Sequence, residues 1–201
     1  MSLLSYHFAK QEGRLWQMQC LLCRVLGIQG DGSQLDDSFM RLSDSQAAEV
    51  WHVSVRNSHI AQPDAEDRVW QQLRLLKAVH LLSCQLDSLP NPRQWRHVVS
   101  LDLSHSKGLT ELPSLEPMRR LQYLSLRHCF DLELRAGLQL PEAVRVVDLS
   151  GCARAQSCPT GSKLPELRVL NLNYCIGESL PALPQPAAVF MLLSDLLRRL
   201  H

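Results

Sequence analysis

One hydrophobic pattern recurs five times along this chain. It consists of an apolar residue, two free positions, a second apolar residue, one free position, a leucine, two more free positions and a cysteine or serine. The copies are LKAVHLLSC (76–84), VVSLDLSHS (98–106), LQYLSLRHC (121–129), VRVVDLSGC (144–152) and LRVLNLNYC (167–175). Their leucine positions are Leu81, Leu103, Leu126, Leu149 and Leu172, at intervals of 22, 23, 23 and 23 residues. This period predicts a repeat protein whose units stack on one another.

Within each copy, apolar and polar positions alternate as in a short β-strand with one buried face. In the third copy, Leu124 and Leu126 are predicted to point inward, whereas Tyr123, Ser125 and Arg127 are predicted to point outward. A single unit cannot bury its leucines alone, so neighbouring units must complete each other's core.

The pattern LxxLxLxxN/C at this period resembles the leucine-rich-repeat family. The resemblance covers residues 74–184 and implies an α/β solenoid of about five repeats with one strand each in a parallel, concave sheet. In that family the last position of the pattern holds an inward Asn or Cys that satisfies backbone groups of the adjacent turn. The resemblance therefore implies a structural ladder of Cys84, Ser106, Cys129, Cys152 and Cys175.

The flanking segments are predicted to be helical and to cap the repeats. Residues 1–73 are expected to form an N-terminal block of about three helices, over 8–26, from 43 or 45 to about 57, and from 63 into the first strand. Residues 185–201 carry apolar residues at helical spacing and are expected to form a C-terminal capping helix.

Two further resemblances concern the chain as a whole. A helical block followed by VVSLDLSHSKGLTELP and LRVLNLNYC is similar to the C-terminal part of Rab geranylgeranyl transferase α-subunits. The catalytic helical repeats of that family are missing, so the resemblance implies an accessory or regulatory repeat domain of an enzyme complex and no prenyl transfer. In size and in its cysteine-type repeat, the chain also resembles small mitochondrial repeat proteins that act as coupling or assembly factors.

Outward strand positions would form the concave face, which carries the Tyr, Arg, His and Asp side chains that partner-contacting surfaces use. His105 and His128 are expected on adjacent strands near Asp102 and Arg127. A metal or acid–base site is one interpretation, but histidines on a polar sheet face more often meet solvent or a partner. The predicted partner contacts are His80, Asp102, His105, Tyr123, Arg127, His128, Asp148, Asn171, Asn173 and Tyr174.

Other chemical motifs are sparse. Cys20 and Cys23 form a CxxC without a second pair, and only His7 and Cys158 offer further ligands, so core cysteines are favoured and a redox or zinc role stays open. The sequence contains no Gly-rich phosphate loop, GxSxG or HExxH motif. We therefore predict no catalytic residue, no metal, no cofactor and no enzymatic activity.

The charge balance and the cysteine content indicate which kind of partner the chain binds and in which compartment it is found. The 201 residues carry 21 Lys and Arg against 20 Asp and Glu, which argues against a broad nucleic-acid surface and leaves RNA-associated scaffolding as an alternative. The longest apolar run, residues 187–193, is too short to span a bilayer. Seven cysteines without a secretory signal favour an intracellular protein. The cytoplasm is favoured, and basic residues near the N-terminus make the mitochondrion the alternative.

The sequence thus favours a non-catalytic scaffold for protein–protein interaction. We expect it to act as an assembly or accessory subunit of a multisubunit complex and to bind other proteins through the concave repeat face.

Overall fold

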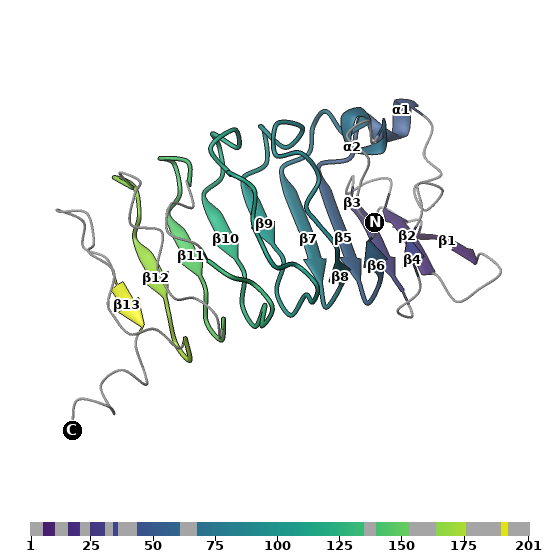
Figure 1. The fold of residues 1–201 in the computed structure, drawn as a ribbon. Helices are drawn as coiled ribbons and strands as arrows, with labels where there is room; N and C mark the ends of the chain where they lie inside the picture. The colour runs from purple at the N-terminus through teal and green to yellow at the C-terminus, as the bar shows by residue number, and fades with distance from the viewer. Residues whose placement is uncertain are drawn as a thin grey trace, which may run out of the picture.

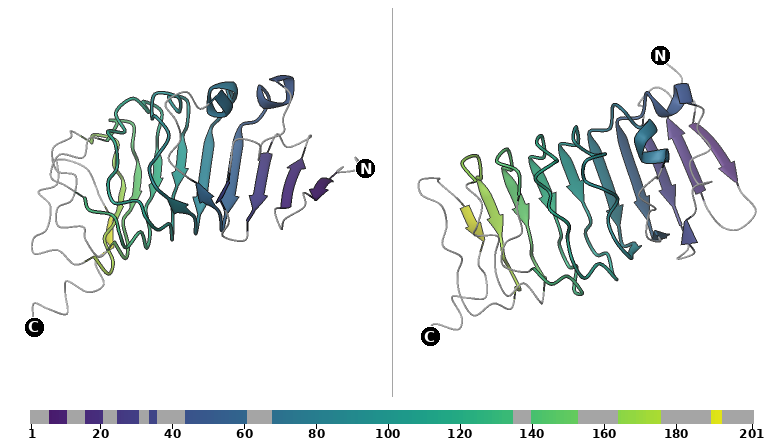
Figure 2. Two further views of the ribbon diagram at one scale, coloured as in Figure 1. Left: turned by 45° about the vertical axis from the view of Figure 1, so that its right-hand side comes forward. Right: turned by 45° about the horizontal axis from the view of Figure 1, so that its top comes forward.

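A ten-stranded sheet runs through the molecule, with its strands in the order β1-β2-β3-β5-β7-β9-β10-β11-β12-β13. Figures 1 and 2 show the strands side by side in one row, with β1 at one end and β13 at the other. The computed structural model describes residues 6–10, 16–20, 25–30, 34–35, 44–60, 68–134, 140–152, 164–175 and 190–192. The strands of the large sheet are β1 (Tyr6–Lys10), β2 (Trp16–Cys20), β3 (Val25–Gln29), β5 (His52–Arg56), β7 (Ala78–Leu82), β9 (Ser100–Asp102), β10 (Tyr123–Ser125), β11 (Val146–Asp148), β12 (Val169–Asn171) and β13 (Phe190–Leu192).

From β3 onward every neighbouring pair in this sheet is parallel, whereas β1, β2 and β3 pair antiparallel. Parallel neighbours need a crossover connection, so each repeat returns behind its own strand. A second parallel sheet contains β4 (Gln34–Leu35), β6 (His59–Ile60) and β8 (Gln85–Leu86). The short helices α1 (Asp44–Ala47) and α2 (Arg68–Gln72) lie at the opposite ends of the strands from this sheet (Figure 1).

The solenoid that the leucine pattern predicts is confirmed in its coarse form. The five copies of the pattern supply β7, β9, β10, β11 and β12, and all five of their leucine positions are buried. The predicted count of about five repeats is not exact, and β3, β5 and β13 pair in the same parallel ladder as the five strands of the pattern.

The predicted helical N-terminal block is wrong in the described residues. Strands β1, β2 and β3 lie in the region expected to be one long helix, and β5 occupies the last part of the second expected helix, of which only α1 is helical among the described residues. Of the third expected helix, α2 is present, and residues 61–67 lie outside the described part. Short apolar runs fit both helix and strand periods, and pairing with a parallel neighbour decides in favour of the strand.

The predicted C-terminal capping helix also needs correction. Its residues 190–192 form β13, which pairs in parallel with β12, and its other residues lie outside the described part of the chain. An exposed end of the β12 ladder offers unpaired backbone groups, and a further strand satisfies them directly.

One apolar cluster runs through the described repeats from Leu26 to Leu172. Inward strand residues form most of it, and a tight turn before each strand adds more. In this strand-entry turn, the backbone N–H of Leu121 donates to the carbonyl of Met118 at 2.9 Å, and the same bond recurs in five other repeats. The rings of Trp70 in α2 and Trp95 in the turn before β9 meet edge to face, with centroids 5.1 Å apart, and both side chains are buried.

Candidate functional site

The outward strand positions, together with the turn position that follows each strand, form the candidate surface. The parallel register makes neighbours of residues that are 22 or 23 positions apart, so Ser125 lies between Asp102 and Asp148. Eight of the ten predicted contact residues lie at these positions, and the other two, Arg127 and Asn173, lie between the strand and the turn position of their repeats. We call this surface the strand face; it consists of His52, His80, Ser100, Asp102, His105, Tyr123, Ser125, Arg127, His128, Asp148, Asn171, Asn173 and Tyr174.

Three acidic or amide side chains of the strand face hold the ends of their own strands. An Oδ1 atom of Asp102 accepts a hydrogen bond from the backbone N–H of Ser104 at 3.0 Å, and the hydroxyl of Ser104 also donates to it. Asp148 and Asn171 accept the same backbone bond, from the residue two positions later, at 2.9 and 3.1 Å. These side chains shape the turn as well as the surface, because each one satisfies a backbone donor that the sheet leaves unpaired.

The exposed part of the strand face is aromatic and basic. Tyr123 is 36% exposed, Tyr174 is 63% exposed, and Arg127 is also exposed. Partial burial, followed by the charges of Asp102 and Asp148, raises the pKa of the Tyr123 hydroxyl, so it stays a neutral hydrogen-bonding group near pH 7. Ser125, which was predicted to be solvent-facing, is only 2% exposed because it packs against Ser104, with their hydroxyl oxygens 2.8 Å apart.

The turn after each strand has a left-handed backbone in six consecutive repeats. Its φ angle is positive at Asn57, Ser83, His105, His128, Gly151 and Tyr174. This conformation brings the rings of His105 and His128 together, with centroids 4.8 Å apart. Partial burial and the neighbouring charges of His105 and Arg127 lower the pKa of His128, which favours the neutral form of this imidazole.

A second histidine pair lies on adjacent strands β5 and β7. Nε2 of His52 is 3.1 Å from Nδ1 of His80, and Nε2 of His80 is 3.3 Å from the hydroxyl oxygen of Ser100. Burial lowers the pKa of both imidazoles, and the charge of His80 adds to the effect at His52. The three residues therefore form a chain of neutral hydrogen-bonding groups across three strands.

The sequence analysis does not place His52 on the strand face, because it predicts a helix for this segment. The signal is nevertheless present: Val50, Val53, Val55 and Ser58 occupy the four template positions, and all four are buried. Valine and serine stand where the other copies carry leucine and cysteine, and the interval from Val55 to Leu81 is 81 − 55 = 26 residues.

The five residues of the expected structural ladder lie in one inward column. The thiols of Cys129, Cys152 and Cys175 donate to the carbonyl of the template leucine in the preceding repeat at 3.1, 3.0 and 2.9 Å. The hydroxyl of Ser106 donates to the carbonyl of Leu81 in the same way at 2.9 Å. The Cys84 thiol donates to the carbonyl of Val55 at 3.6 Å. Each side chain thereby joins one repeat to the one before it.

Burial keeps these thiols protonated. It raises the pKa of Cys129 to about 11 and that of Cys152 to about 12, and it also raises the pKa of Cys84 and Cys175. Since the thiolate is the nucleophile and the metal ligand, the column is chemically quiet at neutral pH. These four cysteines are free thiols.

The described residues include no cluster of three or more His, Cys, Asp or Glu side chains that could hold a metal ion. Cys20 ends β2, and Cys23 lies outside the described part of the chain. Within the described segments, no helix has the length and apolar character needed to cross a membrane.

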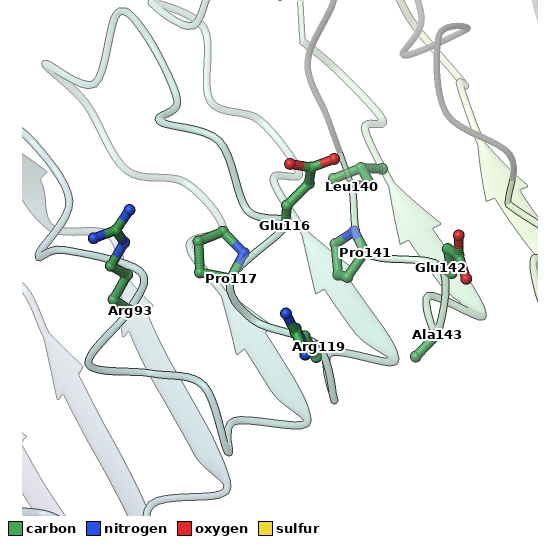
Figure 3. Close-up of a pocket in the computed structure, with 8 residues that line it drawn as sticks. All are labelled: Arg93, Glu116, Pro117, Arg119, Leu140, Pro141, Glu142 and Ala143. Atoms are coloured by element: carbon green, nitrogen blue, oxygen red, sulfur yellow. The ribbon is translucent and has the colours of Figure 1, made fainter.

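A pocket of about 810 Å³ lies away from the strand face, at the turns before β10 and β11. Its lining alternates bases with acids and prolines, as Figure 3 shows: Arg93, Glu116, Pro117, Arg119, Leu140, Pro141, Glu142 and Ala143. Opposite charges around an open rim suit solvent or surface contacts, and no nucleophile or paired acid lies among these residues.

The leucine-rich pattern, the parallel strand ladder and the continuous apolar cluster define a leucine-rich-repeat-like solenoid. Three sequences of the disease resistance protein RRS1 of Arabidopsis thaliana are each 33% identical to this chain over 106 residues. The match covers 50% of this chain and 7 or 8% of the relatives, so the chain spans less than a tenth of the curated relatives it matches.

No family model matches the chain. No solved structure matches it either.

Proposed function

We propose that this chain is a non-catalytic protein-interaction module that binds a partner protein through the strand face and serves as an assembly or accessory subunit of a larger complex. The observation that carries the proposal is the register of the parallel sheet, which pairs exposed Tyr123 with Ser100 on one side and Val146 on the other, while the backbone carbonyl of exposed Arg127 accepts a hydrogen bond from the N–H of His105 in the preceding repeat. Tyrosine and arginine are enriched at interface hot spots, and a hydrogen-bonded sheet loses little backbone entropy on binding.

The similarity to part of a disease resistance protein supports the same proposal, since 106 residues of this chain match a small part of a much larger polypeptide. The His52–His80–Ser100 chain would add neutral donors and acceptors at one end of the surface.

The test replaces Arg127 and Tyr174 together by alanine. Both side chains are exposed, so the double variant should keep its melting temperature, while capture of the partners that copurify with the wild-type chain from native cells should fall by about tenfold or more. Melting is followed by circular dichroism, and capture by quantitative mass spectrometry of the bound fraction.

A matched control replaces Arg93 and Phe130, which are an exposed arginine and a 54% exposed aromatic residue outside the strand face. This control should capture the same partners as the wild-type chain. Retained capture by R127A/Y174A, or equal loss in both double variants, would contradict binding through the strand face.

A further inference from the structure

The strand-entry turns of three consecutive repeats carry an unusual excess of positive charge. Residues 73–77, 95–99 and 118–122 together contain four arginines, one lysine, one histidine and no carboxylate. The same hydrogen bond closes each of these turns, from Leu76 to Leu73, Val98 to Trp95 and Leu121 to Met118. We call the resulting surface the basic edge; it consists of Arg74, Lys77, Arg96, His97, Arg119 and Arg120.

The shared turn geometry brings these cations together in space. Ala78, Ser100 and Tyr123 are register partners, so Arg74, Arg96 and Arg119, four positions before each, occupy the same place in successive repeats. Neighbouring strands are about 4.8 Å apart, so three repeats hold the column within roughly 10 Å. The pKa of His97 is lowered by partial burial and by the charges of Arg96, Arg120 and Lys77, which shows that these cations lie close to one another.

No carboxylate of the described residues forms an ion pair with the basic edge, although Glu116 and Glu142 line the same pocket as Arg119. None of its five arginine and lysine side chains makes an ion pair in the described part of the chain, and the four arginines are exposed. The repeats on either side differ: the matching turn before β5 carries Glu49, and those before β11 and β12 carry Glu142 and Glu166. Glu166 in addition lies 3.7 Å from Arg145. The excess charge is therefore confined to the turns before β7, β9 and β10.

An exposed apolar residue lies within the same edge. Leu75, which is 45% exposed, occupies the turn position that His97 and Arg120 take in the next two repeats. Aliphatic side chains do not stack on nucleobases, and Trp51 (41% exposed) stands only at one end, beside Lys77. A surface that combines arginine forks with an aliphatic contact fits a polypeptide that carries carboxylates and apolar side chains better than it fits a nucleic acid.

We propose that the basic edge binds an acidic, extended segment of a partner protein, with its carboxylates on the column of Arg74, Arg96 and Arg119 and an apolar side chain on Leu75. This surface is distinct from the strand face, because it lies on the turns that enter the strands. The chain would then hold partners at two surfaces of the same repeats.

The test measures fluorescence anisotropy of a labelled short peptide in which glutamate alternates with alanine and leucine. The R74S/R96S/R119S variant should bind this peptide about tenfold more weakly than the wild-type chain at near-physiological salt, since three exposed charge contacts are lost. The matched R56S/K107S/R168S variant removes three exposed cations outside both the basic edge and the strand face, and it should change affinity less than about twofold. Both variants take the net charge from +1 to 1 − 3 = −2.

Thermal melting of both variants checks that the fold is intact, and a salt series on the wild-type chain gives a measurement that needs no variant. Peptide binding should weaken steadily as NaCl is raised. Equal weakening by the two triple variants, or salt-independent binding, would overturn the proposal. Tighter binding of a single-stranded RNA of the same charge, lost in R74S/R96S/R119S, would assign the edge to nucleic acid and overturn it as well. Because the basic edge and the strand face share no residue, a failure of the strand-face proposal would leave this result unchanged.

Discussion

At the scale of single residues, the inward column shows what a cysteine contributes to this repeat. The Cys129 side chain is fully buried, and its thiol donates to the Leu103 carbonyl of the preceding repeat at 3.1 Å. Burial raises the pKa of this thiol to about 11, so it acts as a small neutral donor at pH 7. The position therefore needs a compact side chain with one donor, and Ser106 satisfies the same requirement.

Replacing Cys129 by alanine should lower the free energy of unfolding by about 1–2 kcal/mol, because it leaves the Leu103 carbonyl without its donor and opens a small cavity. Cys129→Ser should lose less, because a hydroxyl makes the corresponding contact from Ser106 at 2.9 Å. Urea unfolding followed by circular dichroism gives both values. A serine variant that is no more stable than the alanine variant would show that the donor is unimportant.

At the scale of elements, the left-handed turn after each strand fixes where the strand face ends. Five of its six described residues are not glycine, with φ between 50° and 62°, and Gly151 has φ 75°. A Cβ atom at position 151 would lie 2.2 Å from Nδ1 of His128, far inside contact distance. This glycine is required by the close approach of the neighbouring ring as well as by its backbone conformation.

Gly151→Ala should therefore lower the free energy of unfolding by about 1–3 kcal/mol, since the His128 ring must move and alanine is strained at positive φ. The matched control is Ser83→Ala, which has φ 54° and keeps a Cβ atom, and it should stay within about 0.5 kcal/mol of the wild-type chain. Thermal or urea unfolding distinguishes the two, and equal losses would contradict a specific role for the glycine.

The sequence predicts elements well where the leucine template is intact and poorly elsewhere. The template identifies the strand in each of five repeats, and with it the inward column and most of the strand face. It does not identify β5, where Val53 and Val55 replace the usual residues, because a short alternating run fits a strand only once its neighbours are known. The histidine chain through His52 and the charge of the basic edge depend on register across repeats, which a single segment does not contain.

At the scale of the whole molecule, the apolar cluster that spans the described repeats couples their stabilities. Each repeat buries its leucines against the next, so a solenoid of this kind unfolds as a chain of nearest-neighbour interfaces. All four tryptophans precede residue 100, so their fluorescence reports the first half of the chain, while circular dichroism reports all of it.

Leu126→Ala removes a fully buried side chain from the repeat of β10 and should lower the free energy of unfolding by about 2–5 kcal/mol. If the repeats are coupled, the urea midpoints measured by fluorescence and by circular dichroism should fall together. A tryptophan transition that keeps its wild-type midpoint while the circular dichroism signal moves would contradict cooperative unfolding. The exposed Phe130→Ala variant, in the same repeat, controls for surface effects.

The inward thiols also allow the opening of individual repeats to be followed separately, by the rate at which each thiol is modified. Cys84, Cys129 and Cys152 are buried in three separate repeats, and each is shielded from reagents by the packing of its own unit and its neighbour. An alkylating reagent reaches such a thiol only through a fluctuation that opens that unit, so its rate of modification measures the free energy of local opening. The modification rates of these cysteines would therefore give the free energy of local opening of each repeat separately.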